Sequence, residues 1–510
     1  MGAASRIVKN TGWLYAKMAI TMFVSLYTTR LILNGLGASD FGIYNVVGGV
    51  ISMLGFINSS MASSTQRFMS YAAGEKNFDR QKKIFNISFV IHILLGIIAI
   101  VVFVAAGVCF FNGILNIPEE RKSAALVVYG CLVISTFFTM ISVPYEAVMN
   151  AHENMKYYAI VGVLESLLKL AVAFAVFSSP IDKLVFYGIL MAIIPFITLS
   201  IMRVYCHWKY EECKISIRRC WDKSLAKEMT GFAGWGFLSS VSAMITMQGM
   251  SILLNMFGGV VVNAAHGIAN QLAGQLMVFS NNMQKALNPV LVKSCGAGEN
   301  KKMLELAFTG NKFSYLIFSY FAIPFIIEAP KVLQLWLKEP PEWAVLFVRL
   351  VLIRQMMSQS FVTLDTCISA TGKIKNTTII NAFIWIFPII TGYLMYKVGF
   401  PIYTIYVLLI IMNIMRMANS LYFCKKLCGL KIKDFILRTL IPCAWQTFAL
   451  LFFFMIECLL LEPSVLRLMI TFLFSCLLHP VLSYFICLDG KEKGLVCSIV
   501  TNIKLRIVKL

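Results

Sequence analysis

The chain has 510 residues, of which 59% are hydrophobic and 14% are charged, with a mean hydropathy of +0.78. Soluble domains carry about 25% charged residues, so this composition excludes a soluble globular protein and indicates that lipid is the main solvent. The net charge of +21 would indicate nucleic-acid binding in a soluble protein. In a membrane protein, positively charged residues gather in the loops on the cytoplasmic side, so their distribution indicates orientation. We expect no nucleic-acid partner.

Apolar runs of helical length follow one another along the whole chain. They lie at about residues 12–36, 41–68, 87–111, 123–149, 158–178, 183–206, 230–256, 262–290, 304–328, 342–370, 378–397, 401–424, 438–461 and 465–487. We therefore predict an all-α polytopic membrane protein with about fourteen transmembrane helices.

The loops alternate between basic and nearly uncharged. Counted over alternate loops and both termini, roughly 30 of the 45 Lys and Arg fall on one side. The positive-inside rule then predicts that both termini are cytoplasmic. The first run is long, contains Lys17 and Arg30, and lacks a small-residue cleavage site, so it reads as a first span rather than a cleaved signal.

Three landmarks recur about 220 residues later. Leu33 matches Leu254 at an offset of 221, Gly74 matches Gly298 at 224, and the segment at 150–158 matches that at 369–376 at 219. The pattern predicts two pseudo-symmetric six-helix lobes. We predict an N-terminal lobe at 1–206, a cytoplasmic basic linker at 207–229, a C-terminal lobe at 230–424, and helices 13 and 14 with a tail at 425–510.

Polar residues form stripes on the second and eighth runs. The stripe residues taken as candidates are Asn45, Ser52 and Gln66 on the second run, and His266, Asn270 and Asn281 on the eighth. Such stripes cannot face acyl chains without unsatisfied polar groups, so they face other helices or a wet cavity. Helix packing explains any single Ser or Asn, whereas the matched stripes favour a polar cavity lining.

Cations outnumber acids within the spans. The candidate cavity cations are Lys17, Arg30, Lys285, Arg349, Arg354 and Arg416. Each intramembrane charge is expensive unless it is paired or hydrated, so a chamber lined by these residues would bind an anion. Glu165 and Lys169 are spaced to neutralise each other on one helix face.

Two acids occupy equivalent positions in the repeat. Glu146 falls on Asp365 at the offset of 219. One interpretation is a pair of rim acids that bind loop cations, and the other is a cytoplasmic gate or protonation site.

No catalytic or nucleotide-binding motif occurs in the chain, and no outer loop exceeds about 15 residues. The 14 cysteines form no CxxC pair, so we predict no metal site and no cofactor. The basic segment from Arg203 to Lys227 carries Trp208 and Trp221 and resembles an interfacial stretch, with aromatic anchors and cations suited to anionic membrane lipid.

The segments NTGWLYAKMAITMFVSLYTTRLILNGLGASDFGIYNVVGGV (Asn10 to Val50) and PYEAVMNAHENMK (Pro144 to Lys156) resemble the Wzx-type polysaccharide flippases of the MOP superfamily, relatives of the MATE exporters. The resemblance covers nearly the whole chain, and its early stretch is the most specific part. It implies a V-shaped pair of six-helix lobes that alternate between inward-open and outward-open states, with two helices appended.

The resemblance also implies a cargo. Such proteins move undecaprenyl-pyrophosphate-linked oligosaccharides from the cytoplasmic to the periplasmic leaflet of the bacterial inner membrane, for O-antigen, capsule or exopolysaccharide assembly. Partner enzymes would be a polysaccharide polymerase and glycosyltransferases. The cavity helices of the family correspond to runs one, two, seven and eight, where Lys17, Arg30 and Lys285 are suited to bind pyrophosphate. Run seven carries no charge from 230 to 257, which departs from relatives that build an ion site there.

Two other functions stay open. A MATE-like ion-coupled drug antiporter would favour acids over cations in its cavity, and a membrane glycosyltransferase or polymerase would show paired carboxylates and a large loop. The charge balance argues against the first and the loop lengths argue against the second. The pattern does not distinguish H⁺ from Na⁺ as a coupling ion.

Overall fold

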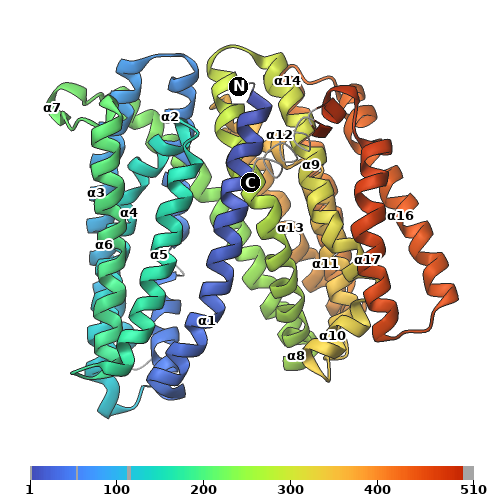
Figure 1. Cartoon of the computed structure of the whole chain (residues 1–510), viewed down its shortest axis with the longest axis horizontal. Coiled ribbons are helices and arrows are strands. Elements are labelled where there is room, and N and C mark those ends of the chain that lie inside the picture. Colours follow the sequence, from blue (N-terminus) through green and yellow to red (C-terminus); the bar gives the residue numbers. More distant parts are fainter. Residues whose placement is uncertain (1–2, 53–54, 112–116, 495, 498–510) are drawn as a thin grey trace, which may run out of the picture. The chain divides into compact units, whose positions relative to one another are not determined.

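The protein folds into helices throughout its described length. The computed structural model describes residues 3–52, 55–111, 117–494 and 496–497, and every regular element among them is helical (Figure 1). Ten helices of the described residues are long and apolar enough to cross a membrane, or twelve if each of two bent pairs is one span. The predicted fold class, an all-α polytopic membrane protein, is confirmed.

The chain divides into two compact units. Lys9–Phe237 forms the N-terminal unit, and Leu238–Leu510 with Met1–Val8 forms the C-terminal unit. The elements before the division are α1 (Ala3–Ser52), α2 (Gly55–Gly74), α3 (Phe78–Cys109), α4 (Glu119–Ala151), α5 (Met155–Ala175), η2 (Val176–Ser178), α6 (Lys183–Lys209), η3 (Glu211–Cys213) and α7 (Ile217–Cys220). The predicted lobe boundaries at 206, 229 and 424 stay predictions.

The division falls within α8 (Lys223–Gly296). The elements after α8 are α9 (Asn300–Ile327), α10 (Ala329–Leu337), α11 (Ala344–Gln359), α12 (Val362–Ala370), α13 (Lys375–Lys397), α14 (Thr404–Cys428), α15 (Ile432–Phe435), η4 (Ile436–Leu440), α16 (Ile441–Leu460), α17 (Val465–Leu482) and η5 (Ser483–Cys487).

Two glycines break the longest helices at equivalent positions. Gly37 interrupts α1 with φ 79° and ψ 166°, and Gly259 interrupts α8 with φ 78° and ψ −175°. A positive φ is readily adopted only by glycine, which has no Cβ to clash with the backbone. The two breaks lie where the first and second apolar runs, and the seventh and eighth, were expected to separate. Their spacing also agrees with the repeat found in the sequence.

We expect Gly259→Ala to destabilise the protein by about 1–2 kcal/mol, because alanine is strained at positive φ. Gly267 is a matched control, since it is helical and no atom lies within 4 Å of where its Cβ would be. Gly267→Ala should be neutral or stabilising by up to about 1 kcal/mol. Thermal unfolding of the two variants in detergent measures the difference, and equal midpoints would contradict the strained turn.

One predicted span ends at a sharp bend, and another is itself bent. The run at 304–328 continues as α10 after an 81° bend, and the run at 342–370 is divided into α11 and α12, which meet at 41°. The second bend has an identifiable cause, because the Thr363 backbone N–H donates to Asn311 Oδ1 at 2.9 Å. In an uninterrupted helix this N–H would donate to the carbonyl of Gln359. The single run predicted at 342–370 is therefore two helices, with Arg354 on α11 and Asp365 on α12.

Each unit has its own apolar core. In the N-terminal unit, α4 packs against α2, α3 and α6, and Val47 of α1 is buried with Phe103 and Tyr129 in one apolar cluster. In the C-terminal unit, α9, α11 and α14 bury Phe347 and Tyr406, whose rings lie 4.4 Å apart. These cores fix the faces on which the polar side chains lie.

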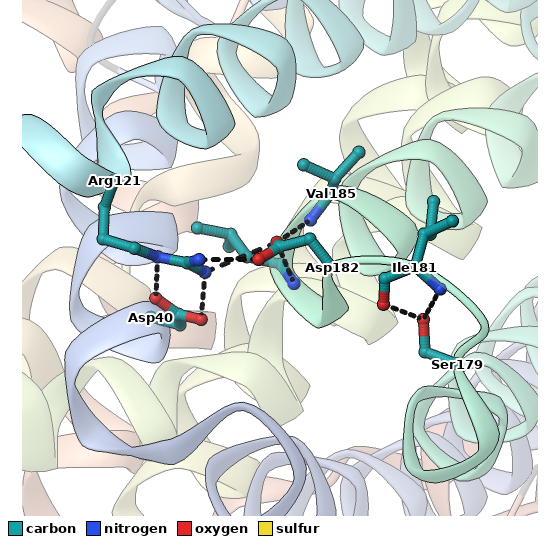
Figure 2. A network of polar contacts seen from close by, with 7 residues as sticks. Asp40, Arg121, Ser179, Ile181, Asp182 and Val185 are labelled. Atoms are coloured by element: carbon teal, nitrogen blue, oxygen red, sulfur yellow. Dashed lines mark hydrogen bonds and ion pairs between the residues drawn. The ribbon is translucent and has the colours of Figure 1, made fainter.

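An ionic network joins α1, α4 and the start of α6 in the N-terminal unit (Figure 2). Arg121 on α4 donates from Nε to Asp40 Oδ1 at 2.9 Å and from Nη1 to Asp182 Oδ2 at 2.6 Å. Asp182 also accepts from the backbone N–H groups of Leu184 and Val185 as the N-cap of α6. Burial alone would raise the pKa of Asp182, but hydrogen bonds from Arg121 and Val185 outweigh it and hold that pKa below its usual value. The network joins the segment of α1 after Gly37 to α4 and α6.

Candidate functional site

A charged cluster lies among α11, α12 and α14 of the C-terminal unit. Asp365 on α12 accepts from Arg416 Nη2 at 3.3 Å and from the Ser420 hydroxyl. Arg416 and Ser420 are four residues apart on α14, so their side chains lie on one helix face. The Arg416 guanidinium also stacks over the Trp385 ring, 4.8 Å from its centroid. Aromatic stacking and ion pairing thus hold this guanidinium in one orientation.

Arg354 on α11 adds a second cation to the cluster. Asn413 donates to the Arg354 carbonyl oxygen at 2.9 Å, which ties α14 to α11 beside the guanidinium. Arg354 and Arg416 repel each other electrostatically. The buried Nε atoms of both residues have no hydrogen-bond acceptor among the described residues. With one carboxylate against two guanidinium groups, the cluster has a net positive charge and spare donors.

A second set of polar side chains, from His266, Asn270 and Tyr406, lies in the C-terminal unit. His266 Nδ1 is 2.7 Å from the Tyr406 hydroxyl, and Asn270 Nδ2 is 2.9 Å from His266 Nε2. His266 also interacts electrostatically with Arg354. The stripe predicted for the eighth run therefore includes an ordered side-chain network that bonds to another helix. These polar side chains contribute to helix packing as well as forming a polar surface.

The N-terminal unit contains a small polar cavity. It has a volume of about 100 Å³ and is lined by α1, α4, α5 and α6. Its charged residues are Lys17, Glu146 and Glu165. The Lys17 ammonium lies over the Tyr158 ring, 4.4 Å from the centroid, and Ser142 donates to Glu146 Oε1 at 3.0 Å. One cation and two acids therefore face the same space.

The volume of this cavity decides what it can hold. Ligand pockets for drug-sized molecules have volumes of about 300–1,000 Å³, so a space of about 100 Å³ is too small for an oligosaccharide head group. It has room for a few waters or a small ion. Lys169, which is not among the lining residues, donates to Glu165 Oε1 at 2.6 Å, so the pair expected from the sequence forms.

Gly162 makes room for the Lys17 ammonium. A Cβ on Gly162 would lie 2.2 Å from Lys17 Cε and 2.4 Å from Nζ. We expect Gly162→Ala to move Lys17 out of the cavity at a cost below about 1 kcal/mol, because a lysine end is flexible. Increased labelling of Lys17 by an amine-acylating reagent, read by mass spectrometry, measures the displacement.

Gly130→Ala is the matched control for this substitution. Gly130 lies in the helix packed beside the cavity, and no atom lies within 4 Å of its would-be Cβ. Unchanged Lys17 labelling is expected in this variant. Equal labelling in both variants would show that Gly162 does not determine where Lys17 lies.

Other predicted cations have different surroundings. Arg349 donates from Nε to the Ile326 carbonyl at 2.9 Å, so it caps the end of α9. Arg30 is exposed, and Lys285 is half-buried. The prediction that these three residues line a substrate cavity stays a prediction.

The remaining polar candidates show no common environment. Asn45 is exposed and donates to the Phe41 carbonyl within its own helix. Gln66 is half-buried and Asn281 is exposed. The side chain of Ser52 lies outside the described residues.

Residues that the sequence did not single out complete both sites. Tyr158 and Gly162 are four residues apart on α5 and form the wall against which Lys17 lies. Trp385 on α13 supports Arg416. A large and a small residue at helical spacing could have indicated the first pair, whereas nothing in the local pattern connects Trp385 with α14.

Comparison with known proteins identifies the fold. Residues 15–175 match the MatE family model, and comparison with curated protein sequences finds no match. A MATE protein crystallised in a straight conformation matches with 14% identity and a TM-score of 0.71, over 84% of this chain and 97% of that chain. An outward-facing multidrug resistance MATE family transporter of the MOP superfamily matches with 14% identity and a TM-score of 0.70 over the same shares.

A third similar structure is a MOP superfamily transporter from Pyrococcus furiosus, described as having a binding pocket of reverse polarity that suggests a different function. It matches with 14% identity and a TM-score of 0.68, over 84% of this chain and 98% of that chain. At this level of identity the likenesses show the fold, so the chain has the fold of the MATE transporters of the MOP superfamily.

Proposed function

We propose that this protein is a flippase that moves undecaprenyl-pyrophosphate-linked oligosaccharides across the bacterial inner membrane. The observation that carries the proposal is the charge of the C-terminal cluster, where Arg416 pairs with Asp365 and Arg354 adds a second cation near Arg416. Spare guanidinium donors in a low-dielectric setting favour a doubly charged phosphate over a cation. The cargo would be a repeat unit of O-antigen, capsule or exopolysaccharide.

The physical task explains why such a cluster is useful. A pyrophosphate and its sugars cannot cross hydrocarbon without losing many kcal/mol of hydration. A guanidinium group offers paired donors that match phosphate oxygens, while the lipid tail stays among acyl chains. Alternating access then transfers the head group between leaflets, and Glu146 and Asp365 are candidate gate or coupling acids for H⁺ or Na⁺.

Further parts of the proposal concern the cell. The loops rich in Lys and Arg lie on the same side of the membrane as both termini. Because such loops are cytoplasmic, both termini are cytoplasmic in this proposal. The partners would be the glycosyltransferases that build the cargo and the polymerase that consumes it. The resemblance to Wzx-type flippases and the match of residues 15–175 to the MatE model support this assignment.

Reconstitution tests the proposal. Liposomes would contain the full chain and a fluorescent undecaprenyl-pyrophosphate disaccharide, and a membrane-impermeant reductant would bleach the outer leaflet only. With the protein present, we expect bleaching to extend to the inner pool. Fluorescent phosphatidylcholine should remain protected under the same conditions. Movement of both lipids, or of neither, would contradict a specific flippase.

A MATE-like drug antiporter is the second candidate. It is favoured by the two acids of the N-terminal cavity, Glu146 and Glu165, and by the similarity in fold to a multidrug resistance transporter. Resistance to cationic dyes on overexpression, lost in Glu165→Gln, would support this function. Unchanged dye sensitivity together with pyrophosphate-lipid movement would support the flippase.

A further inference from the structure

The loop between α6 and α8 presents cations beside exposed aromatic side chains. We call residues 210–222 the basic loop; it contains η3 and α7. Lys214, Arg218 and Arg219 are exposed on it. Trp208, just before the loop, is 82% exposed and Trp221 is 47% exposed. Exposed tryptophan beside arginine is unusual on a surface that faces only water.

The basic loop is firmly attached to the N-terminal unit. Asn86 on α3 donates to the Lys214 carbonyl at 3.2 Å and accepts from the Ser216 N–H at 2.6 Å. Cys213 and Cys220 are buried against the unit. The exposed residues therefore belong to an ordered surface.

Two of the three acids in the basic loop are engaged internally, and the third, Glu211, is exposed. The Glu212 carboxylate bonds to His152, and Asp222 accepts from Lys83 at 3.2 Å. The hydrogen bond from the Leu225 backbone N–H holds the pKa of Asp222 below its usual value, and the bond from Lys83 acts in the same direction with a smaller effect. By contrast, no described acid lies within ion-pair distance of Arg218 or Arg219. Three exposed cations, Lys214, Arg218 and Arg219, outnumber the exposed Glu211, so the outer surface of the loop is net positive.

The level of this surface in the membrane follows from α6. Ile193, Phe196 and Val204 are exposed along the apolar span of α6, and Trp208 follows Val204 by one turn. Lys209 ends the helix. Tryptophan followed by lysine at the end of a lipid-facing helix marks the boundary between hydrocarbon and head groups. The basic loop begins at this boundary.

We propose that Arg218, Arg219 and the neighbouring Trp221 form a binding site for the head group of an anionic phospholipid in the adjacent leaflet. The guanidinium groups would bind the phosphodiester oxygens, and Ile217 and Trp221, both exposed, would contact the glycerol and upper acyl chain. A soluble polyanion needs only the charges, whereas the apolar neighbours favour a lipid. This site is separate from the transported cargo and holds whether or not the proposed function is correct.

Lipid titration followed by native mass spectrometry tests the site. The delipidated full chain in neutral detergent would be titrated with phosphatidylglycerol and with phosphatidylcholine of the same acyl chains. We expect tighter binding of phosphatidylglycerol, and a roughly tenfold loss of that preference in Arg218→Ala/Arg219→Ala, because two cations near the head group are removed. The double variant Arg218→Gln/Arg219→Gln should lose the preference to the same extent as the double alanine variant. It keeps polar side chains of similar length, so it controls for a folding defect.

Lys425→Ala/Lys426→Ala is the matched control, because it removes two exposed cations from the last turn of α14. It should change the preference by less than about twofold, since a diffuse surface charge contributes little. Equal binding of the two lipids, or equal losses in the loop and control variants, would overturn the proposal. Displacement of phosphatidylglycerol by glycerol phosphate at equal concentration would also overturn it, since a plain phosphate site would then suffice.

Discussion

Arg354→Ala should lower transport of pyrophosphate-linked lipid by roughly 10- to 100-fold while leaving the fold intact. The expected loss corresponds to a charge-assisted hydrogen bond of about 1.5–3 kcal/mol to the cargo phosphate. Folding should be spared because the Arg354 Nε has no described acceptor and the contact with Asn413 uses the backbone carbonyl. The liposome assay measures transport, and thermal unfolding in detergent measures stability.

Arg349 is the matched control on the same helix, five residues away. Its guanidinium donates to the carbonyls of Ile326 and Ile327 at the end of α9. The last carbonyls of a helix have no partner within the helix, so Arg349 supplies their donor. Arg349→Ala should therefore destabilise the protein by about 1–2 kcal/mol but keep transport per folded molecule. If Arg349→Ala stops transport and Arg354→Ala does not, the assignment of the anion site to Arg354 is wrong.

Glu492→Gln should destabilise the C-terminal unit by about 3–5 kcal/mol, the largest effect on stability that we expect. The side chains of Lys312 and Glu492 are 3% and 4% exposed, and Lys312 Nζ lies 2.6 Å from Glu492 Oε2. Thr309 and the Asp489 N–H also donate to this carboxylate. Neutralising the acid leaves the Lys312 ammonium buried without its counter-charge. Thermal unfolding at one fixed heating rate measures the loss.

Two further variants separate burial from pairing. Lys312→Met/Glu492→Leu should recover most of the stability, because neither charge then stays buried. Lys169→Met removes an ion pair of the same 2.6 Å length whose side chains are 42% and 41% exposed, and it should cost below about 1 kcal/mol. Equal losses for Glu492→Gln and Lys169→Met would rule out burial as the cause.

The apolar runs and their repeat could be predicted from the sequence because they depend on composition and spacing alone. A run of some twenty apolar residues has to form a backbone-satisfied helix in lipid, whatever lies beside it. The breaks at Gly37 and Gly259 follow the same logic, since both occur between two runs and use glycine, which alone readily combines a positive φ with an extended ψ. The pair of Glu165 and Lys169 was likewise predictable, because one helix sets its spacing.

The partners of the other intramembrane charges were decided only by the tertiary structure. The sequence places Arg349 and Arg354 one and a half turns apart, yet the first caps α9 and the second lies near Arg416. The bond from Arg416 to Asp365 joins residues 51 positions apart, and that from Lys312 to Glu492 joins residues 180 positions apart. Helical periodicity determines the face on which a side chain lies, whereas the neighbour on that face depends on how separate helices pack, which no local pattern records.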